Sequence, residues 1–297
     1  MSNIADAVFL PLTNHTGSRI LFSMNRLSQE KRIAVVAALV EGNSIRATCR
    51  MTDVAKGTAL KLLVDLGAAC ESYQRTVLVD VPCKRIQCDE IWAFVYAKGR
   101  NVTPGMEQRG AGSVWTWTAL DADTKLMVSW LIGGRDAGFA AAFMGDVARR
   151  LRNRVQMTTD GHHAYLSATQ EAFGGEIDYA QLIKIYGPAP DDGNRRYSPP
   201  SFVSSERRVI RGEPDDKHVS TSYVERQNLT MRMSMRRFTR LTNGFSKKVE
   251  NLEAAVALHF MHYNFCRIHQ TLRVTPAMTA GISDHVWELD ELVRLLG

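Results

Sequence analysis

The sequence predicts an α/β fold in which a five-stranded sheet is flanked by helices and follows a small all-α unit. First, hydrophobic residues recur at helical spacing between residues 28 and 67. Second, residues 85–132 hold three runs rich in β-branched and aromatic residues, which are typical of strands. Helical and strand patterns then alternate up to residue 186, and two long helical stretches follow. With 297 residues, the chain is long enough for one large domain or two smaller ones.

Residues 26–72 are predicted to form three short helices, after an N-terminal arm at residues 1–25 that shows no periodicity. Ser28 is the expected N-cap of the first helix, residues 44–50 form the second, and Thr52 or Asp53 is the expected N-cap of the third, which ends at Gly67. Three short helices with tight turns suit a helix-turn-helix DNA-binding domain, whose third helix would carry Lys56 and Lys61 into a groove. A plain three-helix cap on the next domain has the same pattern, but the basic third helix favours DNA binding.

Five strands are predicted between residues 80 and 186, in a domain that extends to residue 280. They cover residues 85–96, 114–120, 126–132, 155–159 and 179–186. Asp136 is the expected N-cap of the helix between the third and fourth strands. Residues 187–220 contain five prolines and several glycines, so they are predicted to form a long irregular loop. Long helices are predicted from Tyr223 and from Val249 to about Ile268, with a C-terminal helix at residues 281–297.

The composition narrows the class of protein. The net charge of +6 favours polyanionic partners such as nucleic acid without identifying one. None of the five cysteines forms a C-x-x-C pair, so zinc-ribbon spacing is absent and reduced thiols are expected. The N-terminus lacks a cationic start followed by an apolar core, and no apolar run of about 18 residues is present. We therefore expect a cytoplasmic protein without a membrane segment.

Three carboxylates occupy positions where acids are unusual. Asp89 lies in the middle of an apolar strand, Asp160 at the carboxyl end of another, and Glu225 in the first turn of a later helix. Ionised carboxylates are seldom placed on buried strands unless something neutralises them. If the three converge, they form an oxygen-only site suited to Mg²⁺ or Mn²⁺. Glu90 is a rival ligand, but strand alternation points its side chain to the opposite face from Asp89.

The helix that begins near Glu225 is strongly basic. Residues at i, i+3 and i+7 share a helix face, so Glu225, Asn228 and Arg232 are expected to point the same way. No acid occurs from residue 226 to residue 248, where the basic residues are Arg226, Arg232, Arg236, Arg237, Arg240, Lys247 and Lys248. Such a run is often only a solvated face. Beside a metal site, it would also suit a phosphate backbone.

Three short motifs resemble a known family. Cys88-Asp89-Glu90-Ile91-Trp92, Thr159-Asp160-Gly161 and Tyr223-Val224-Glu225-Arg226-Gln227-Asn228 resemble the DDE motif of bacterial insertion-sequence transposases. The most similar group is the one named after insertion sequence one. The resemblance spans roughly residues 80 to 280, and the block around Glu225 is its most specific part. Some relatives carry cysteine-rich zinc modules at the N-terminus, which this chain lacks.

The resemblance implies a ribonuclease H-like domain with a mixed sheet, in a nucleoid-associated bacterial protein. It implies that Asp89, Asp160 and Glu225 hold two Mg²⁺ or Mn²⁺ ions. Water would cut DNA at the element ends, and the freed 3′ hydroxyl would attack target DNA. A homodimer or larger assembly is expected, because two DNA ends must be brought together. The residues expected to contact DNA are Arg226, Asn228, Arg232, Arg236 and Arg237, together with Lys56 and Lys61 of the helical unit.

Two other functions fit the same residues. A ribonuclease H-like nuclease or resolvase would use the same metal site to cut without joining. A catalytically silent DNA-binding regulator would bind DNA without the acids, which the intact carboxylates disfavour. A proton-carrying histidine near the metals, either His163 or His269, is a further hypothesis, whereas His259 falls among apolar helix residues and is expected to be packed in the core.

Overall fold

A computed structural model describes residues 27–107, 110–187, 201–239 and 243–297. The predicted N-terminal arm at residues 1–25 lies outside the described residues, as does the proline-rich part of the predicted loop, residues 188–200.

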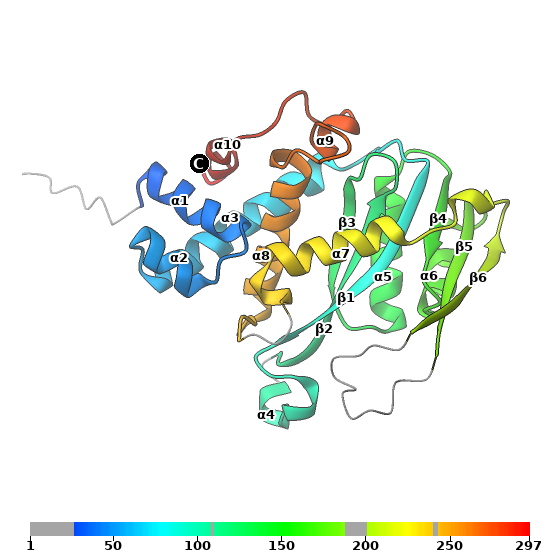
Figure 1. Cartoon of the computed structure of the whole chain (residues 1–297), viewed down its shortest axis with the longest axis horizontal. Helices are drawn as coiled ribbons and strands as arrows, with labels where there is room; N and C mark the ends of the chain where they lie inside the picture. The colour runs from blue at the N-terminus through cyan, green and yellow to red at the C-terminus, as the bar shows by residue number, and fades with distance from the viewer. Residues whose placement is uncertain (1–26, 108–109, 188–200, 240–242) are drawn as a thin grey trace, which may run out of the picture.

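A mixed six-stranded sheet forms the centre of the fold (Figure 1), in the order β3-β2-β1-β4-β5-β6. The strands are β1 (Arg85–Val95), β2 (Gly112–Asp121), β3 (Met127–Gly133), β4 (Val155–Thr159), β5 (Ile177–Tyr186) and β6 (Phe202–Arg211). β1 is antiparallel to β2 and parallel to β4, β4 is parallel to β5, and β5 is antiparallel to β6. This arrangement is α/β and compatible with a ribonuclease H-like fold.

The prediction of five strands was wrong by one. β6 lies within residues 187–220, which were predicted to be an irregular loop, and it pairs along the length of β5 from Tyr179–Arg211 to Tyr186–Phe202. Nearly all of its residues are exposed. The strand is therefore an edge strand held by backbone hydrogen bonds to β5, and its Ser-Ser-Glu-Arg-Arg sequence has no apolar face that would reveal it.

Helices cover both faces of the sheet. α5 (Ala137–Arg150) and α6 (Ala164–Phe173) lie on one face, where Trp117 of β2 contacts Phe143 and Tyr165. Asp136 caps α5 as predicted, by accepting hydrogen bonds from two backbone amides. α7 (Ser222–Ser234) and α8 (Val249–Met261) lie on the other face, and in Figure 1 α7 crosses in front of β1 and β2.

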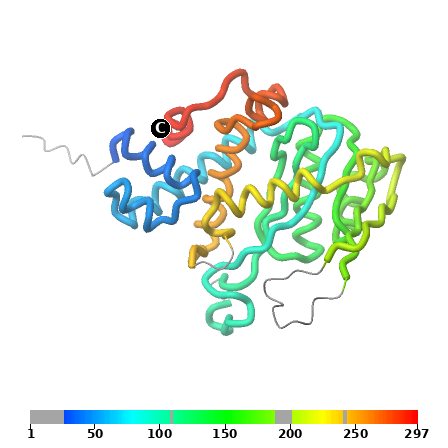
Figure 2. The backbone as a smooth tube through the Cα atoms, viewed as in Figure 1, coloured from blue at the N-terminus to red at the C-terminus, as the bar shows by residue number. Residues whose placement is uncertain are grey.

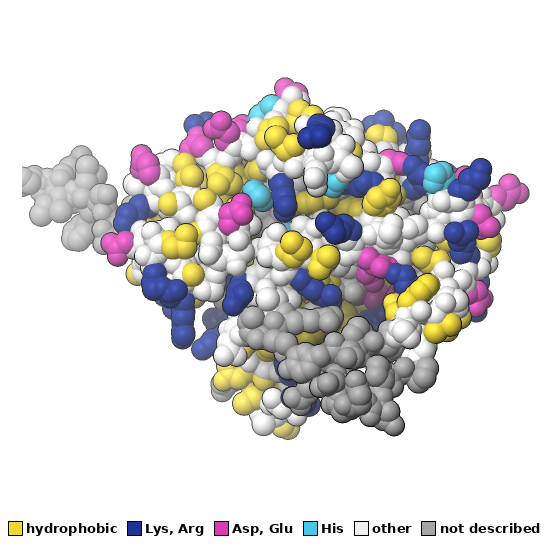
Figure 3. All heavy atoms as spheres, in the orientation of Figure 1, with side chains coloured by type: hydrophobic (Ala, Val, Ile, Leu, Met, Phe, Trp, Pro, Cys, Tyr) yellow, Lys and Arg dark blue, Asp and Glu magenta, His cyan; other side chains and the backbone are white. Residues whose placement is uncertain are grey.

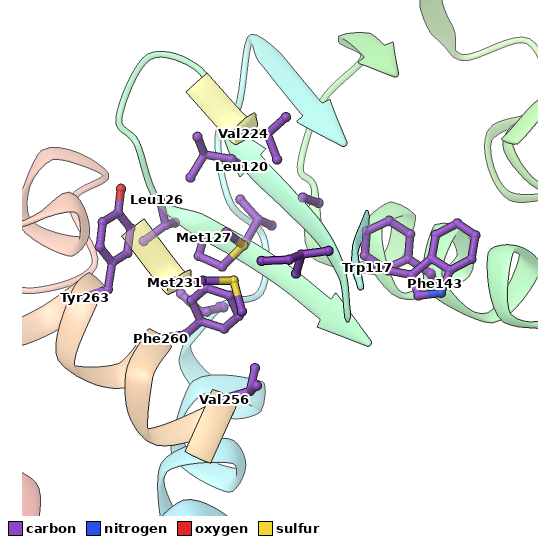
Figure 4. Packing of buried hydrophobic residues seen from close by; sticks show 14 of the residues in the cluster. Trp117, Leu120, Leu126, Met127, Phe143, Val224, Met231, Val256, Phe260 and Tyr263 are labelled. Atoms are coloured by element: carbon purple, nitrogen blue, oxygen red, sulfur yellow. The ribbon is translucent and has the colours of Figure 1, made fainter. Parts of the chain in front are cut away.

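The core runs without interruption from the sheet into the helices on the α7 side. Figure 4 shows Val224 of α7 beside Leu120 of β2, and Phe260 of α8 beside Met231 and Met127. All of these side chains are almost completely buried. Their burial ties α7 to the strands that carry the candidate site, so the helix has one orientation over the sheet.

The three predicted N-terminal helices are present as α1 (Gln29–Val40), α2 (Ile45–Thr52) and α3 (Lys56–Val77). Ser28 is the N-cap of α1, as expected, and Ser44 caps α2. The predicted cap of the third helix was wrong, because Thr52 and Asp53 end α2 and Ala55 is the N-cap of α3. α3 does not end at Gly67 but continues to Val77. Inside the helix, the missing side chain of Gly67 lets α8 cross closely. A Cβ at this position would come within 2.4 Å of the Cα of Ala254. The helix-turn-helix assignment itself stays a prediction.

The C-terminal part returns to the N-terminal helices. α8 ends at Met261, earlier than predicted, and a π-helical turn (His262–Cys266) follows. α9 (Pro276–Thr279) and α10 (Leu289–Arg294) come next, and Figure 2 shows this last segment lying against α1. The side-chain amide of Gln29 donates to Asp290 at 2.9 Å.

α4 (Pro104–Glu107) and three short 3-10 turns (Gly99–Asn101, Asp216–His218 and Arg236–Phe238) complete the described elements. None of the helices in the described ranges has the length and apolarity needed to cross a bilayer.

Candidate functional site

Asp89 is held from several sides in the middle of β1. The side-chain amide of Asn228 in α7 donates to its Oδ2 at 2.8 Å, and the backbone amide of Glu90 donates to Oδ1 at 2.9 Å. The hydroxyl of Thr118, the residue opposite on β2, donates to the carbonyl of Asp89 at 3.0 Å. Asp89 therefore faces α7 with a restricted orientation.

Asp160 directly follows β4, which runs parallel to β1, so the parallel pair carries both acids toward one region of the sheet. Its Oδ1 accepts from the backbone amide of His162 at 2.9 Å, and its Oδ2 lies 3.7 Å from Arg135. The convergence of Asp89 and Asp160, expected from their positions on two strands, is present.

Glu90 completes the tightest acidic cluster. Asp89, Glu90 and Asp160 each offer an oxygen, and these three oxygens all lie within 4.8 Å of one another. The Glu90 side chain is 1% exposed, and its Oε2 lies 3.0 Å from Arg135. Its Oε1 has no hydrogen-bond partner among the described residues. Glu90 does face α5 and α6, as strand alternation predicted, yet Asp160 is close to both neighbouring acids.

Burial and mutual repulsion keep the carboxyls of Asp89 and Glu90 weakly acidic. Burial, reinforced by the charge of Asp160, raises the pKa of Asp89 to about 6. Burial also raises the pKa of Glu90 to about 7, with the nearby Tyr165 hydroxyl and Arg135 opposing part of the rise. Such a cluster of desolvated oxygens, one of them unpartnered, has the chemistry of a cation site, and its all-oxygen donor set fits Mg²⁺ or Mn²⁺.

Glu225 lines the same pocket but has its own cation. The side chain is 40% exposed and contacts Lys184 of β5 and the hydroxyl of Thr221. It does not belong to the cluster of oxygens within 4.8 Å, although its charge contributes to the raised pKa of Asp89. The pocket measures about 510 Å³, and we call it the acidic pocket. Its walls include Asp89, Asp160, Glu225, Arg135, Lys184, His162 and His163.

The residues expected to contact DNA do not form one row. Asn228 is 5% exposed and is bonded to Asp89, so it orients that carboxylate rather than facing solvent. Arg232 is half-buried near the end of α7, and Arg226 is exposed but lines a pocket other than the acidic one. Lys61 is exposed and pairs with Asp65 at 2.6 Å. Figure 3 shows Lys and Arg side chains spread over the face that carries α7, with acidic side chains among them.

Three of the expected DNA contacts do converge. Lys56 of α3 lines a pocket of about 620 Å³ with Arg236 and Arg237, which follow α7. The other basic residues in its wall are Arg46 and Lys247, and within the described part of the chain no acid lines it. Burial lowers the pKa of Arg237 to about 10, and its Nε donates to Ser246 at 2.7 Å. We call this the Lys56 pocket, and its uncompensated charge suits a polyanion.

The histidines singled out from the sequence, His163, His269 and His259, lie in three different environments. His163 lines the acidic pocket together with His162, so it stays available to the proton-carrier hypothesis. His269 does not line that pocket, and the hypothesis for it is therefore abandoned. His259 is packed in the core as expected, where burial lowers its pKa to about 3.

Comparison of the chain with models of known protein families and with curated proteins finds no match. The site itself is a pocket in which Asp89, Asp160 and Glu225 lie together with Arg135 and Lys184.

Proposed function

We propose that this protein is a DNA transposase of the DDE type, which cleaves DNA at the ends of an insertion sequence and joins the freed 3′ hydroxyl to target DNA. The observation that carries the proposal is the acidic pocket. Three acids far apart in the sequence, Asp89, Asp160 and Glu225, line it together. The three motifs that resemble the transposase family contain these same acids.

Asp89, Asp160 and Glu225 would hold the two Mg²⁺ or Mn²⁺ ions of such an enzyme, with Glu90 beside them. When bound, divalent ions of this kind activate an attacking oxygen and stabilise the leaving oxygen at phosphorus. The raised pKa values of Asp89 and Glu90 support this assignment, since a cation would relieve the repulsion that burial intensifies.

The remaining residues of the pocket orient the acids and neutralise charge. Asn228 and Thr118 fix Asp89, as the hydrogen bonds above describe. Arg135 contacts Glu90 and Asp160, and Lys184 contacts Glu225, so the pocket keeps a fixed arrangement of opposite charges. Arg135 and Lys184 also supply positive charge for a phosphate of the strand to be cut.

The Lys56 pocket supports DNA as the substrate. It lies between α3 of the predicted helix-turn-helix unit and the segment that follows α7. Five basic residues line it, and none of the described residues in its wall is acidic. Contacts of this kind position a duplex through its phosphates without reading its sequence.

A nicking assay tests the proposal. A supercoiled plasmid that carries the gene for this chain with its flanking DNA is incubated with the protein and Mg²⁺ or Mn²⁺. We expect metal-dependent nicks at the flanks, lost in Asp89→Asn, Asp160→Asn and Glu225→Gln. Glu176→Gln is the matched control, because Glu176 is 86% exposed and its ion-pair partner, Arg154, does not line the acidic pocket. Wild-type cutting in an acid variant would exclude that acid from the site.

A joining assay separates the transposase from a nuclease or resolvase. Duplexes that end in a 3′ hydroxyl at the mapped nick are mixed with a target plasmid and metal. Covalent joining of the labelled end to the plasmid is expected. Cutting without any joined product would leave the nuclease as the correct function.

A further inference from the structure

α7 places residues on a second pocket as well. Tyr223, Arg226, Gln227 and Thr230 follow the i, i+3, i+4 and i+7 spacing of one helix face and line a pocket of about 320 Å³. The other wall comes from Lys125, in the turn between β2 and β3, and from residues 267–271 after the π-helical turn. None of its lining residues also lines the acidic pocket, so the two are separate. We call it the Arg267 pocket.

The Arg267 pocket collects positive charge. Its titratable walls are Lys125, Arg226, Arg267, His269 and two tyrosines, and no Asp or Glu among the described residues lines it. Arg226 and Arg267 are exposed, and neither forms an ion pair with any residue in the described ranges. The Lys125 ammonium lies 3.2 Å from the centroid of the Tyr223 ring and donates to the carbonyl of Ala122. The charge of the buried Asp121, itself bonded to Thr124, also acts on it.

The cations of the pocket act on one another. Burial together with the charges of Lys125 and Arg267 lowers the pKa of His269. Burial also lowers the pKa of Lys125; the charge of Asp121 opposes this effect and the charge of Arg85 adds to it. A bound anion would relieve both effects, because it favours the protonated form of each group.

An unused donor lies in the same wall. Gln227 is 3% exposed, and its Nε2 has no hydrogen-bond partner within the described part of the chain. A buried amide without a partner costs free energy, and a ligand with acceptor oxygens would satisfy it. The hydroxyls nearby are already engaged, Thr230 with the carbonyl of Arg226 and Thr271 with the ring of His269.

We infer that the Arg267 pocket binds a phosphate group of a nucleic-acid strand, outside the pocket where that strand is cut. Cations and a free amide donor are the groups that recognise phosphate oxygens. The inference rests on the proposed function for the identity of the strand. Because Glu225 and Arg226 are neighbours on α7, a phosphate held here would set the position of the DNA relative to the acids without touching the cleaved bond.

Charge-matched variants test the inference through DNA binding in EDTA, where no cleavage occurs. Arg267→Gln removes one charge from the pocket, and Arg149→Gln removes one from α5, where the Arg149 side chain is 73% exposed. A labelled duplex from the flanking DNA is titrated by fluorescence anisotropy over a range of salt concentrations. We expect Arg267→Gln to weaken binding about tenfold and to lower the salt slope by about 1. Arg149→Gln should leave both quantities at the wild-type value.

A second measurement tests directly whether the Arg267 pocket binds phosphate. The ring signal of His269, identified by its loss in His269→Gln, is followed by NMR against pH in inorganic phosphate and in chloride of equal ionic strength. Phosphate should raise the pKa of His269 in the wild type but not in Arg267→Gln. If phosphate raises it but Arg267→Gln binds the duplex like wild type, the pocket takes a free phosphate and the inference is overturned.

The two proposals fail differently. Loss of DNA affinity in Arg267→Gln supports the phosphate pocket even when no nicking is detected, because the binding assay contains no metal. Metal-dependent nicking with equal DNA affinity and salt slope in Arg267→Gln and Arg149→Gln overturns the pocket and leaves the proposed cleavage intact.

Discussion

The acidic pocket and the Arg267 pocket share α7 but handle charge in opposite ways. In the acidic pocket, Asp89 is largely buried on β1, Asp160 and Glu225 are partly exposed, and Arg135 and Lys184 balance the acids from within. In the Arg267 pocket, Arg226 and Arg267 are exposed, and no acid balances them. Buried charge is sensitive to single changes, whereas exposed charge acts mainly on binding. Substitutions in the first pocket should therefore affect chemistry and stability, and those in the second should affect DNA affinity.

The largest expected effect concerns the third acid of the acidic pocket. Glu225→Gln should lower metal-dependent nicking at least about a thousandfold, because a lost metal ligand removes several kcal/mol of transition-state stabilisation. Glu90→Gln should lower it only about tenfold, since Glu90 faces α5 and α6 and its Oε2 contacts Arg135. Initial nicking rates at saturating Mn²⁺ measure both. The opposite ranking would make Glu90 the ligand and Glu225 the supporting acid.

Asn228 tests whether orientation of Asp89 matters. Asn228→Ala removes the 2.8 Å bond to Oδ2, and we expect nicking to fall about 10- to 100-fold, as for residues that orient metal ligands. Leu229→Ala, at the next and exposed position of α7, is the control for changes in the helix itself. Rates are compared with the affinity for Mn²⁺ from calorimetry. A normal rate in Asn228→Ala would show that Asp89 is held adequately without this contact.

The same pocket predicts how stability depends on pH and metal. Glu90 has a folded pKa of about 7 against an ordinary value of 4.5, and Asp89 about 6 against 3.8. Folding therefore disfavours their ionised forms, so the penalty is absent below about pH 4, grows as the pH rises, and is complete above about pH 7. In EDTA, the Tm should fall across this range.

Metal should reverse that loss. At a Mn²⁺ concentration 100 times its dissociation constant, binding adds about 2.7 kcal/mol to the free energy of unfolding, which raises the Tm by several degrees. The rise should be larger at pH 7.5 than at pH 5, where the carboxyls are partly protonated, and Glu90→Gln should flatten the pH dependence in EDTA. Calorimetric scans measure both. An equal rise at the two pH values would contradict a site made of these carboxyls.

Strands with an apolar face could be predicted from the sequence, and the polar edge strand could not. β1 and β4 have nearly the predicted bounds, because their β-branched and aromatic runs are buried against helices. β6 forms through backbone pairing with β5, and its apolar residues, Phe202, Val203, Val209 and Ile210, lie only near its ends and do not alternate with the polar ones. Gly67 was predicted to end α3, but it provides the close crossing with α8, and only the tertiary structure distinguishes these two uses of a glycine.

The candidate site was predictable where it depends on strand direction. Asp89 and Asp160 converge because β1 and β4 are parallel neighbours. The alternation that separates Asp89 from Glu90 was also correct, but the nearness of Asp160 to both is a property of the adjacent strand and has no local signal. The contact of Glu225 with Lys184 joins residues 41 positions apart, so no pattern around either residue indicates it.

The smallest expected effect separates two lysines that the sequence treats alike. Lys56 and Lys61 both lie on α3 and were both predicted to contact DNA. Lys56 lines the Lys56 pocket with Arg236 and Arg237, whereas Lys61 is 76% exposed and already pairs with Asp65. Lys56→Gln should weaken binding of the flanking duplex in EDTA about threefold to tenfold, and Lys61→Gln should change it less than twofold. Equal losses from the two variants would mean that α3 lies along the DNA as a whole, as a recognition helix does, and that the pocket has no special part in holding it.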